Sequence, residues 1–298
     1  MCRRQIDMKA KDFVDLVLLA AVWGASFLFM RMGAPEFGAI ALVQLRMLIA
    51  ALFLLPILML RIGFAELPQN WKPLTILGLL NSAIPMILLT YSTLFVTAGY
   101  SSIFNAMAPL WGALVAWIWL SERLNRTGII GLLVGFIGVA VLAGDTESLT
   151  SAGSTLAVVA AIGGAFFYGV GANYARRYTR HLKSMSVATG SMLFPAILLL
   201  PLTVIFWPDV PPSGRAWFAL IAMGIASTGF AYILYFRLIA NVGPAKAITV
   251  AYLIPAFAVI WGALFLDETV TALMIIGCLI IFLGTALVTG VFPTRGKR

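Results

Sequence analysis

Apolar stretches of 18 or more residues recur along the whole chain, and short polar connections separate them. Each stretch is long enough to cross a lipid bilayer as an α-helix. Turn residues mark several connections, among them Gly33-Ala34-Pro35 and Gly243-Pro244. We predict ten membrane-spanning helices, at about 13–31, 38–60, 73–95, 100–120, 127–144, 153–175, 186–207, 216–238, 245–266 and 272–292.

The composition agrees with an all-α integral membrane protein. Of the 298 residues, 62% are hydrophobic and 10% are charged, whereas soluble domains carry about 25% charged residues. The net charge of +9 could indicate a nucleic-acid partner. Basic loops also orient membrane proteins, so we expect the lipid bilayer as partner and no nucleic acid.

The second half of the chain repeats the first. Pro109 and Glu122 recur as Pro255 and Glu268, both displaced by 146 positions. Further matches at 145 or 146 positions run through both halves: Gly24 with Gly169, Pro56 with Pro201, Trp71 with Trp217, Gly78 with Gly224, Gly131 with Gly277 and Gly138 with Gly284. The sequence therefore predicts two five-helix repeats, 13–144 and 153–292, between tails at 1–12 and 293–298.

The basic residues predict the orientation. Seventeen of the twenty Lys and Arg residues fall in tails and loops on one predicted side, whereas only Arg31 and Arg215 fall on the other. Cytoplasmic loops carry the excess of basic residues, so both termini are expected in the cytoplasm. Because each repeat has five helices, the second repeat must enter the membrane upside down. Inverted repeats are typical of secondary transporters that work by alternating access, with the substrate site at the repeat interface.

Several motifs resemble the EamA-type family of the drug/metabolite transporter superfamily. They are Trp23-Gly24-Ala25-Ser26-Phe27, Leu45-Arg46, and the block from Pro109 through Leu120-Ser121-Glu122-Arg123-Leu124 to Gly138, with its echo from Pro255 to Gly284. The likeness covers both halves. It implies a ten-helix exporter of small metabolites in the bacterial inner membrane, most similar to the amino-acid exporters, including those for aromatic amino acids. Tyr168 and Ser191 stand where Trp23 and Arg46 would map, so any role of Arg46 is not duplicated.

Arg46 is the first candidate for substrate binding. It lies about eight residues into the second predicted span, where a charge is costly and must face protein or a water-filled cavity. It could anchor a substrate carboxylate. Alternatively, it could be a structural arginine bonded to backbone carbonyls, or one that extends outward to the membrane surface.

The other candidates are polar or aromatic residues within the spans. They could line an amphipathic pocket or simply pack in the core; they are Asn81, Tyr91, Asn105, Trp111, Tyr168, Thr228, Tyr232 and Tyr252. Three prolines, Pro85, Pro109 and Pro255, could kink helices for packing. Proline also frees a backbone carbonyl one turn earlier, which a cavity or polar substrate could satisfy.

Several kinds of chemistry have no recognisable motif. The acidic residues lie in tails, loops or span ends, Asp15 comes nearest to an exception, and His181 is the single histidine. We therefore expect no metal, no cofactor and no enzymatic activity. The chain is predicted to export small molecules and to function as a monomer, with an oligomer as the alternative. The alternatives are an intramembrane enzyme, which would need a nucleophile or carboxylate pair, and a lipid flippase or scaffold.

Overall fold

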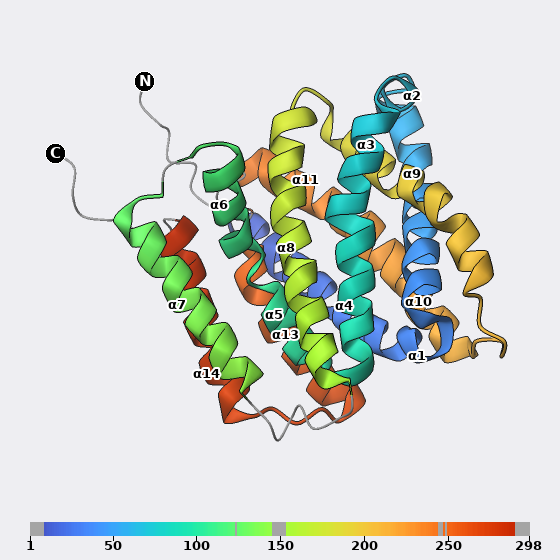
Figure 1. Cartoon of the computed structure of the whole chain (residues 1–298). Coiled ribbons are helices and arrows are strands. Elements are labelled where there is room, and N and C mark those ends of the chain that lie inside the picture. The colour runs from blue at the N-terminus through green and yellow to red at the C-terminus, as the bar shows by residue number, and fades with distance from the viewer. Residues whose placement is uncertain (1–8, 123, 145–152, 244–246, 248, 290–298) are drawn as a thin grey trace, which may run out of the picture.

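The computed structural model describes residues 9–122, 124–144, 153–243, 247 and 249–289, and the regular elements in these ranges are helices (Figure 1). In chain order they are α1 (Ala10–Arg61), α2 (Glu66–Gln69), α3 (Trp71–Gly78), η1 (Leu79–Ala83), α4 (Ile84–Phe95), α5 (Ala98–Asn105), α6 (Ala108–Trp119), α7 (Arg126–Ala143), α8 (Ser154–Tyr178), α9 (Ser184–Ile205), α10 (Gly214–Gly224), η2 (Ile225–Phe230), α11 (Ala231–Val242), α13 (Val250–Leu266) and α14 (Ala272–Thr289).

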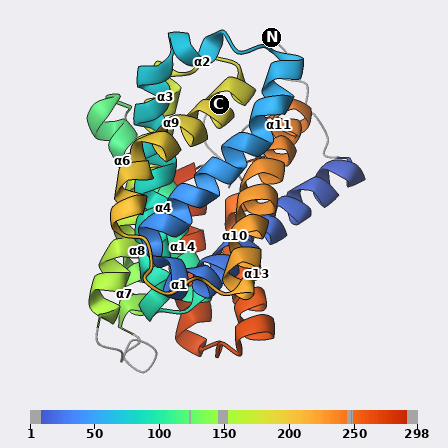
Figure 2. The ribbon, with the colours of Figure 1, turned by 90° about the vertical axis from the view of Figure 1, so that its right-hand side faces the viewer.

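The long helix α1 consists of two helical segments that meet at Gly38. This glycine has φ 71° and ψ 163°, a backbone conformation that is essentially restricted to glycine. The chain turns there, and the two segments diverge from the lower end of the bundle in Figure 2. The expected turn at Gly33-Ala34-Pro35 is wrong, because these residues are helical and the left-handed glycine makes the turn instead.

Two short π-helical segments interrupt long helices at corresponding places in the two halves. Segment η1 joins α3 to α4, and η2 joins α10 to α11. The glycines just before them, Gly78 and Gly224, allow close backbone approach. A Cβ atom on Gly78 would lie 2.3 Å from the carbonyl oxygen of Ser191, and one on Gly224 would lie 3.3 Å from that of Arg46. Arg46 and Ser191 themselves correspond, at a displacement of 145 positions.

A second pair of corresponding contacts joins the halves. A Cβ atom on Gly24 would lie 2.7 Å from the Cβ atom of Phe257, and one on Gly169 would lie 2.9 Å from that of Trp111. Gly24 and Gly169 are 145 positions apart, and Trp111 and Phe257 are 146 apart. The crossing of α13 by the first helical segment of α1 therefore uses the residues that correspond to those at the crossing of α6 by α8.

Helices α7 and α14 pack backbone to backbone along one side of the bundle (Figure 1). A Cβ atom on Gly131 would lie 2.7 Å from the carbonyl oxygen of Gly284, and one on Gly284 would lie 2.4 Å from the nitrogen of Gly135. The glycines of α7 thus pack closely against those of α14. Small residues allow such approach between membrane helices.

Large apolar side chains cover much of the outer surface. On α7 and α9 they include Ile130, Leu133, Ile197 and Leu198, each at least half exposed. A lipid bilayer solvates such a surface, whereas a soluble protein rarely exposes so much of it. Among the described residues, eight helices of 18 residues or more are apolar enough to span a membrane, and α13 is a shorter apolar helix. The chain is a multi-pass membrane protein.

Candidate substrate-binding site

Arg46 lies in the interior of the bundle, on the second helical segment of α1. Its side chain is almost fully buried, so the prediction that it faces the protein is confirmed. The Nε atom donates a hydrogen bond to the Oγ1 atom of Thr228, at 2.8 Å. Nη1 is buried and has no hydrogen-bond partner among the described residues. One guanidinium nitrogen is therefore held in place while another is available to a ligand.

Thr228 is positioned by the π-helical geometry of η2. Its hydroxyl donates to the carbonyl oxygen of Met223, five residues earlier, at 3.0 Å. Since a hydroxyl has one proton, the oxygen that faces Arg46 can only accept there. This arrangement fixes the orientation of the guanidinium group. π-helical turns of this kind occur frequently at functional sites.

Two predicted tyrosines complete the surroundings of Arg46. Tyr168 of α8 and Tyr232 of α11 both lie near the guanidinium group. Tyr232 also lies beside Ser82 of η1, which corresponds to Thr228 at a displacement of 146 positions. Its ring stacks on Phe236, with centroids 5.8 Å apart. The helices α1, η1, η2, α8 and α11 thus bring the guanidinium group of Arg46 together with two phenol hydroxyls and the apolar faces of their rings.

The remaining candidates lie against other parts of the bundle. Asn81 packs on Gly171 of α8, and Tyr91 packs on Phe95, with ring centroids 5.3 Å apart. The Tyr252 hydroxyl lies 2.9 Å from that of Thr289 on α14. The structure does not bring these side chains into the contacts that surround Arg46.

Asn105 and Trp111 are partly buried polar residues near a break between helices. The Asn105 Oδ1 and Trp111 Nε1 atoms have no hydrogen-bond partner among the described residues. The Trp111 ring packs edge-on against Phe136 and Phe166, with centroids 5.1 and 5.4 Å away. Both residues therefore keep a free polar atom beside apolar surface.

The three prolines occupy different local settings. Pro85 begins α4 directly after η1, and Pro109 begins α6 after the break between α5 and α6. At Pro109 the missing N–H costs nothing, because the first amides of a new helix have no partner within it. Pro85 instead lies within the continuous run from α3 to α4, where its missing N–H leaves a carbonyl oxygen of the preceding turn without its helical partner. Pro255 lies inside α13 and is buried.

Sequence reasoning missed several buried polar contacts. Gln44 is buried two residues before Arg46, and its Nε2 atom donates to the carbonyl oxygen of Ala196, at 3.0 Å. At the start of α1, Asp15 is buried and paired with Arg237 of α11. The signal for Gln44 was present, since it is an amide within an apolar span.

The arrangement around Arg46 can bind a carboxylate in an apolar setting. A guanidinium group binds carboxylates through charge-assisted hydrogen bonds, and tyrosine hydroxyls can donate further bonds. In the described ranges, no cluster of three or more His, Cys, Asp or Glu residues could hold a metal ion.

The model of the EamA-like transporter family matches residues 14–144 and again residues 155–290. The uncharacterized transporter YoaV of Bacillus subtilis strain 168 is 24% identical over 96% of this chain and 99% of its own. A probable terminal-alkyne amino-acid exporter of Streptantibioticus cattleyicolor is 26% identical, over 95% and 94% of the two chains. A solved crystal structure matches with a TM-score of 0.65 at 20% identity, over 95% and 98%; that likeness shows the fold.

Both halves of the chain thus match one family model, the relatives are named as transporters, and the structure has the apolar helices of a membrane protein. The chain belongs to the EamA-like transporter family, within the drug/metabolite transporter superfamily, and is a transporter.

Proposed function

We propose that this protein exports amino acids, preferably aromatic or other hydrophobic ones, by alternating access between two inverted five-helix halves. The observation that carries the proposal is the buried guanidinium group of Arg46, with Nε held by Thr228 and Nη1 free of hydrogen-bond partners among the described residues. A buried charge in a membrane protein is costly unless it is paired or functional. A substrate carboxylate would supply the missing partner.

The helix boundaries support ten membrane crossings. A straight helix of 52 residues would be about 78 Å long, far more than a hydrocarbon core of about 30 Å. The break at Gly38 divides α1 into two crossings. With α3–η1–α4, α5–α6 and α10–η2–α11 each counted once, and α7, α8, α9, α13 and α14 added, the number is ten.

The corresponding contacts support an inverted arrangement of the halves. Five crossings per half place equivalent helices in opposite directions across the membrane. Gly24 packs on Phe257 as Gly169 packs on Trp111. The same contact would therefore occur twice, between pairs of helices that run in opposite directions across the membrane. Such a construction gives inward-open and outward-open states of similar energy. The basic loops favour a plasma membrane location, in bacteria the inner membrane, with cytoplasmic termini.

The surroundings of Arg46 support an amino-acid substrate. Arg46 would bind the carboxylate, while the rings of Tyr168 and Tyr232 would supply apolar surface for a side chain. One relative is named as an amino-acid exporter. The family and its transporter-named relatives favour a transporter over an enzyme, and the substrate class rests on Arg46.

The test is uptake of labelled phenylalanine and tryptophan into proteoliposomes that contain the purified protein, with and without a pH gradient. Saturable uptake that other amino acids compete away is the expected result. Arg46→Gln should abolish most of it, because the neutral amide removes the charge on which carboxylate binding depends. Arg46→Lys should retain part, since it keeps the charge without the planar fork.

Ser191→Ala is the matched control, because Ser191 holds the corresponding position in the second half and its hydroxyl already donates to the carbonyl oxygen of Ala188. It should transport as the wild type does. Equal uptake by the wild type and the folded Arg46→Gln variant would contradict the proposed role of Arg46. Uptake of no amino acid, but movement of a labelled lipid, would establish the flippase alternative instead.

A further inference from the structure

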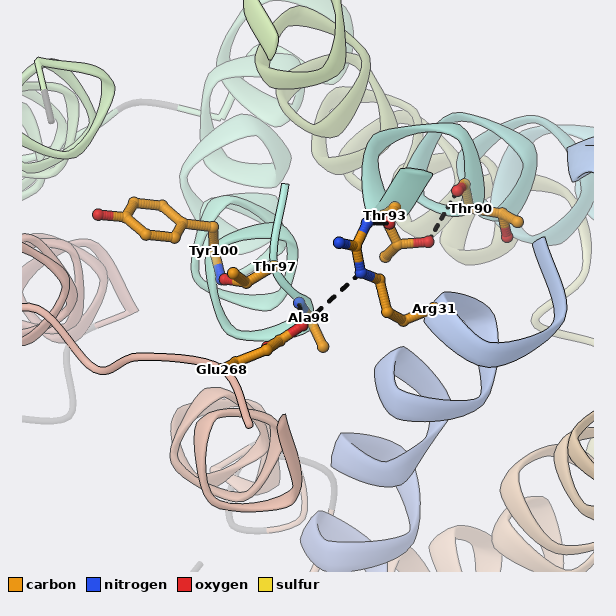
Figure 3. A network of polar contacts seen from close by, with 7 residues as sticks. All are labelled: Arg31, Thr90, Thr93, Thr97, Ala98, Tyr100 and Glu268. Carbon is orange, nitrogen blue, oxygen red and sulfur yellow. Dashed lines mark hydrogen bonds and ion pairs between the residues drawn. The ribbon is translucent and has the colours of Figure 1, made fainter. Parts of the chain in front are cut away.

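Arg31 and Glu268 form an ion pair at one end of the bundle. Arg31 lies near the end of the first helical segment of α1, and Glu268 lies in the connection from α13 to α14. Figure 3 shows the guanidinium group turned toward the carboxylate, with Nε and Oε1 3.8 Å apart. The same Oε1 atom accepts a hydrogen bond from the backbone N–H of Ala98, at 2.9 Å. Glu268 therefore ties the start of α5 to α1.

A second ion pair lies at the other end of the bundle. Arg176, near the end of α8, donates from Nη1 to the Oε2 atom of Glu122 at 3.1 Å, and its Nη2 atom also contacts the carboxylate. Glu122 lies in the connection from α6 to α7. Figure 1 shows the α13–α14 connection at the lower end of the bundle and the end of α8 at the upper end.

The two ion pairs occupy corresponding positions in the two halves. Arg31 and Arg176 are 145 positions apart, and Glu122 and Glu268 are 146 apart. In each pair, the arginine belongs to one half and the carboxylate to the other. Each ion pair therefore joins the two halves at one end of the bundle. Superposing the first half on the second would place one ion pair on the other.

The two ends differ in how well each carboxylate is held. Glu268 is 10% exposed, whereas Glu122 is 45% exposed. Ala98 supplies a backbone N–H to Glu268, but the position that corresponds to Ala98 is Pro244, which has no N–H to donate. Exposed ion pairs contribute little because water and salt screen them. The Glu268 carboxylate is therefore the better shielded of the two and is held by a backbone amide, whereas Glu122 is held by the two hydrogen bonds from Arg176 in a more exposed setting.

A cavity of about 440 Å³ adjoins the Glu268 ion pair. Arg31 and Glu268 line it together with Glu36, Arg215 and apolar residues that include Leu94 and Leu266. A cavity lined by both charged and apolar side chains thus adjoins the contact that joins the halves at this end.

We propose that the Arg31–Glu268 and Arg176–Glu122 ion pairs are the two gates of the transport path, one at each end. Each gate holds the halves together at its own end, and release of one gate lets that end open. Because the Glu268 gate is buried and capped, it opens less readily than the Glu122 gate. The inference rests on the proposed alternating access, and it adds the contacts that control it.

The test measures access to the interior without any substrate. A variant with Cys2→Ser and Cys278→Ser receives one reporter, Asn105→Cys, in the middle of the bundle. A membrane-impermeant thiol reagent is then added to sealed vesicles of either orientation. Glu268→Gln should raise labelling from the Glu268 end about ten-fold, and Glu122→Gln should raise labelling from the Glu122 end about two-fold, because exposed pairs are the weaker contacts.

Two controls separate gating from damage to the fold. Thr97→Ala removes the oxygen that caps α5 by accepting from the N–H of Tyr100, but it leaves the ion pair intact, so labelling should not change. Glu268→Asp keeps a carboxylate that can accept from the backbone N–H of Ala98 and pair with Arg31, so labelling should stay closer to the wild-type rate than in Glu268→Gln. Labelling that rises equally from both ends, or as much for Thr97→Ala as for Glu268→Gln, would overturn the inference.

Cross-linking supplies an independent measurement. With cysteines at positions 31 and 268, a short bifunctional thiol reagent should block labelling of the reporter from the Glu268 end alone. Unchanged labelling after complete cross-linking would also overturn the gate. None of these readouts requires transport, so a wrong substrate assignment would leave them unaffected and would appear only as absent amino-acid flux.

Discussion

The Nε atom of Arg46 lies 2.8 Å from the hydroxyl oxygen of Thr228, although 182 positions of sequence separate the two residues. The contact crosses from the first half of the chain to the second. Thr228 is in turn bonded to Met223 through the π-helical turn of η2. The guanidinium group that we assign to substrate binding is therefore held by a contact between the halves.

Thr228→Val should weaken substrate binding while preserving the fold. The substitution keeps the side-chain shape but removes the oxygen that accepts from Arg46, and hydrogen bonds to charged groups contribute about 1.5–3 kcal/mol. We expect the apparent KM for phenylalanine uptake to rise about ten-fold or more. Thr228→Ser keeps the hydroxyl and should stay near the wild-type value. Equal KM values for the two variants would refute the orienting role.

Gly169→Ala should destabilise the protein, because α8 and α6 have no room for a methyl group where they cross. The new Cβ atom would lie 2.6 Å from the backbone nitrogen of Gly112, and a backbone atom cannot move aside as a side chain does. Overpacking of this kind costs about 1–3 kcal/mol. Thermal unfolding in detergent should show a lower Tm. Gly214→Ala, where no atom lies within 4 Å, is the control and should unfold at the wild-type temperature.

Gly38→Ala should also lower the Tm, for a different reason. Space is available at this position, but φ 71° with ψ 163° is a conformation that costs a residue with a side chain about 1–3 kcal/mol. Gly144→Ala provides the comparison, since Gly144 caps a helix at φ −82°, which alanine adopts freely. A Tm for Gly38→Ala equal to that of Gly144→Ala would show that the turn tolerates a side chain.

Acidification should open the Glu268 gate at a higher pH than the Glu122 gate. Burial raises the pKa of the Glu268 carboxyl, against the opposing effects of the amides of Ala98 and Gly99 and the charge of Arg31. The hydrogen bond from Arg176 lowers the pKa of Glu122. As pH falls from neutral, Glu268 therefore gains its proton first and loses its ionic attraction to Arg31.

The charged groups around Glu268 do not change the order in which Glu268 and Glu122 gain their protons as the pH falls. Arg31 and Glu36 of α1 and Arg215 of α10 line the adjoining cavity. The hydrogen bonds from the backbone and side chain of Ser213 lower the pKa of the Glu36 carboxyl, so Glu36 stays ionised while Glu268 gains its proton. The ratio of reporter labelling from the two ends, measured as a function of pH, checks the prediction. Taking the ratio cancels the pH dependence of the thiol. If labelling from the Glu122 end rises at a higher pH than labelling from the Glu268 end, the prediction is contradicted.

Much of the fold could be predicted from apolar runs and turn residues. The apolar span at 73–95, for example, matches the continuous run from α3 to α4. The π-helical turns could not be predicted, because an apolar period does not distinguish a π-turn from an α-turn. The turn was predicted at Gly33-Ala34-Pro35 and not at Gly38, because proline is common in turns but is also compatible with a helix. A positive φ cannot be predicted from the sequence beyond the presence of a glycine.

The candidate site could be predicted only in part. A lone arginine in an apolar span must be buried in protein, and Arg46 is. Its partner Thr228 was among the candidates, but their contact depends on how the two halves pack. Tyr252 shows the limit, because its polar tip lies against Thr289 of α14 and periodicity alone does not reveal which neighbour a helix face meets.

The glycine contact between α7 and α14 has a consequence for how the halves can move. The two helices correspond, one in each half, and their backbones touch at Gly131, Gly135 and Gly284. At Gly284 the nearest atoms of α7 are backbone atoms of Gly131 and Gly135, so the two helices have little room to slide or separate there. In the alternating access that we propose, this line would therefore move least, the largest displacements would occur on the opposite side of the bundle, and the α7–α14 pair would act as the pivot.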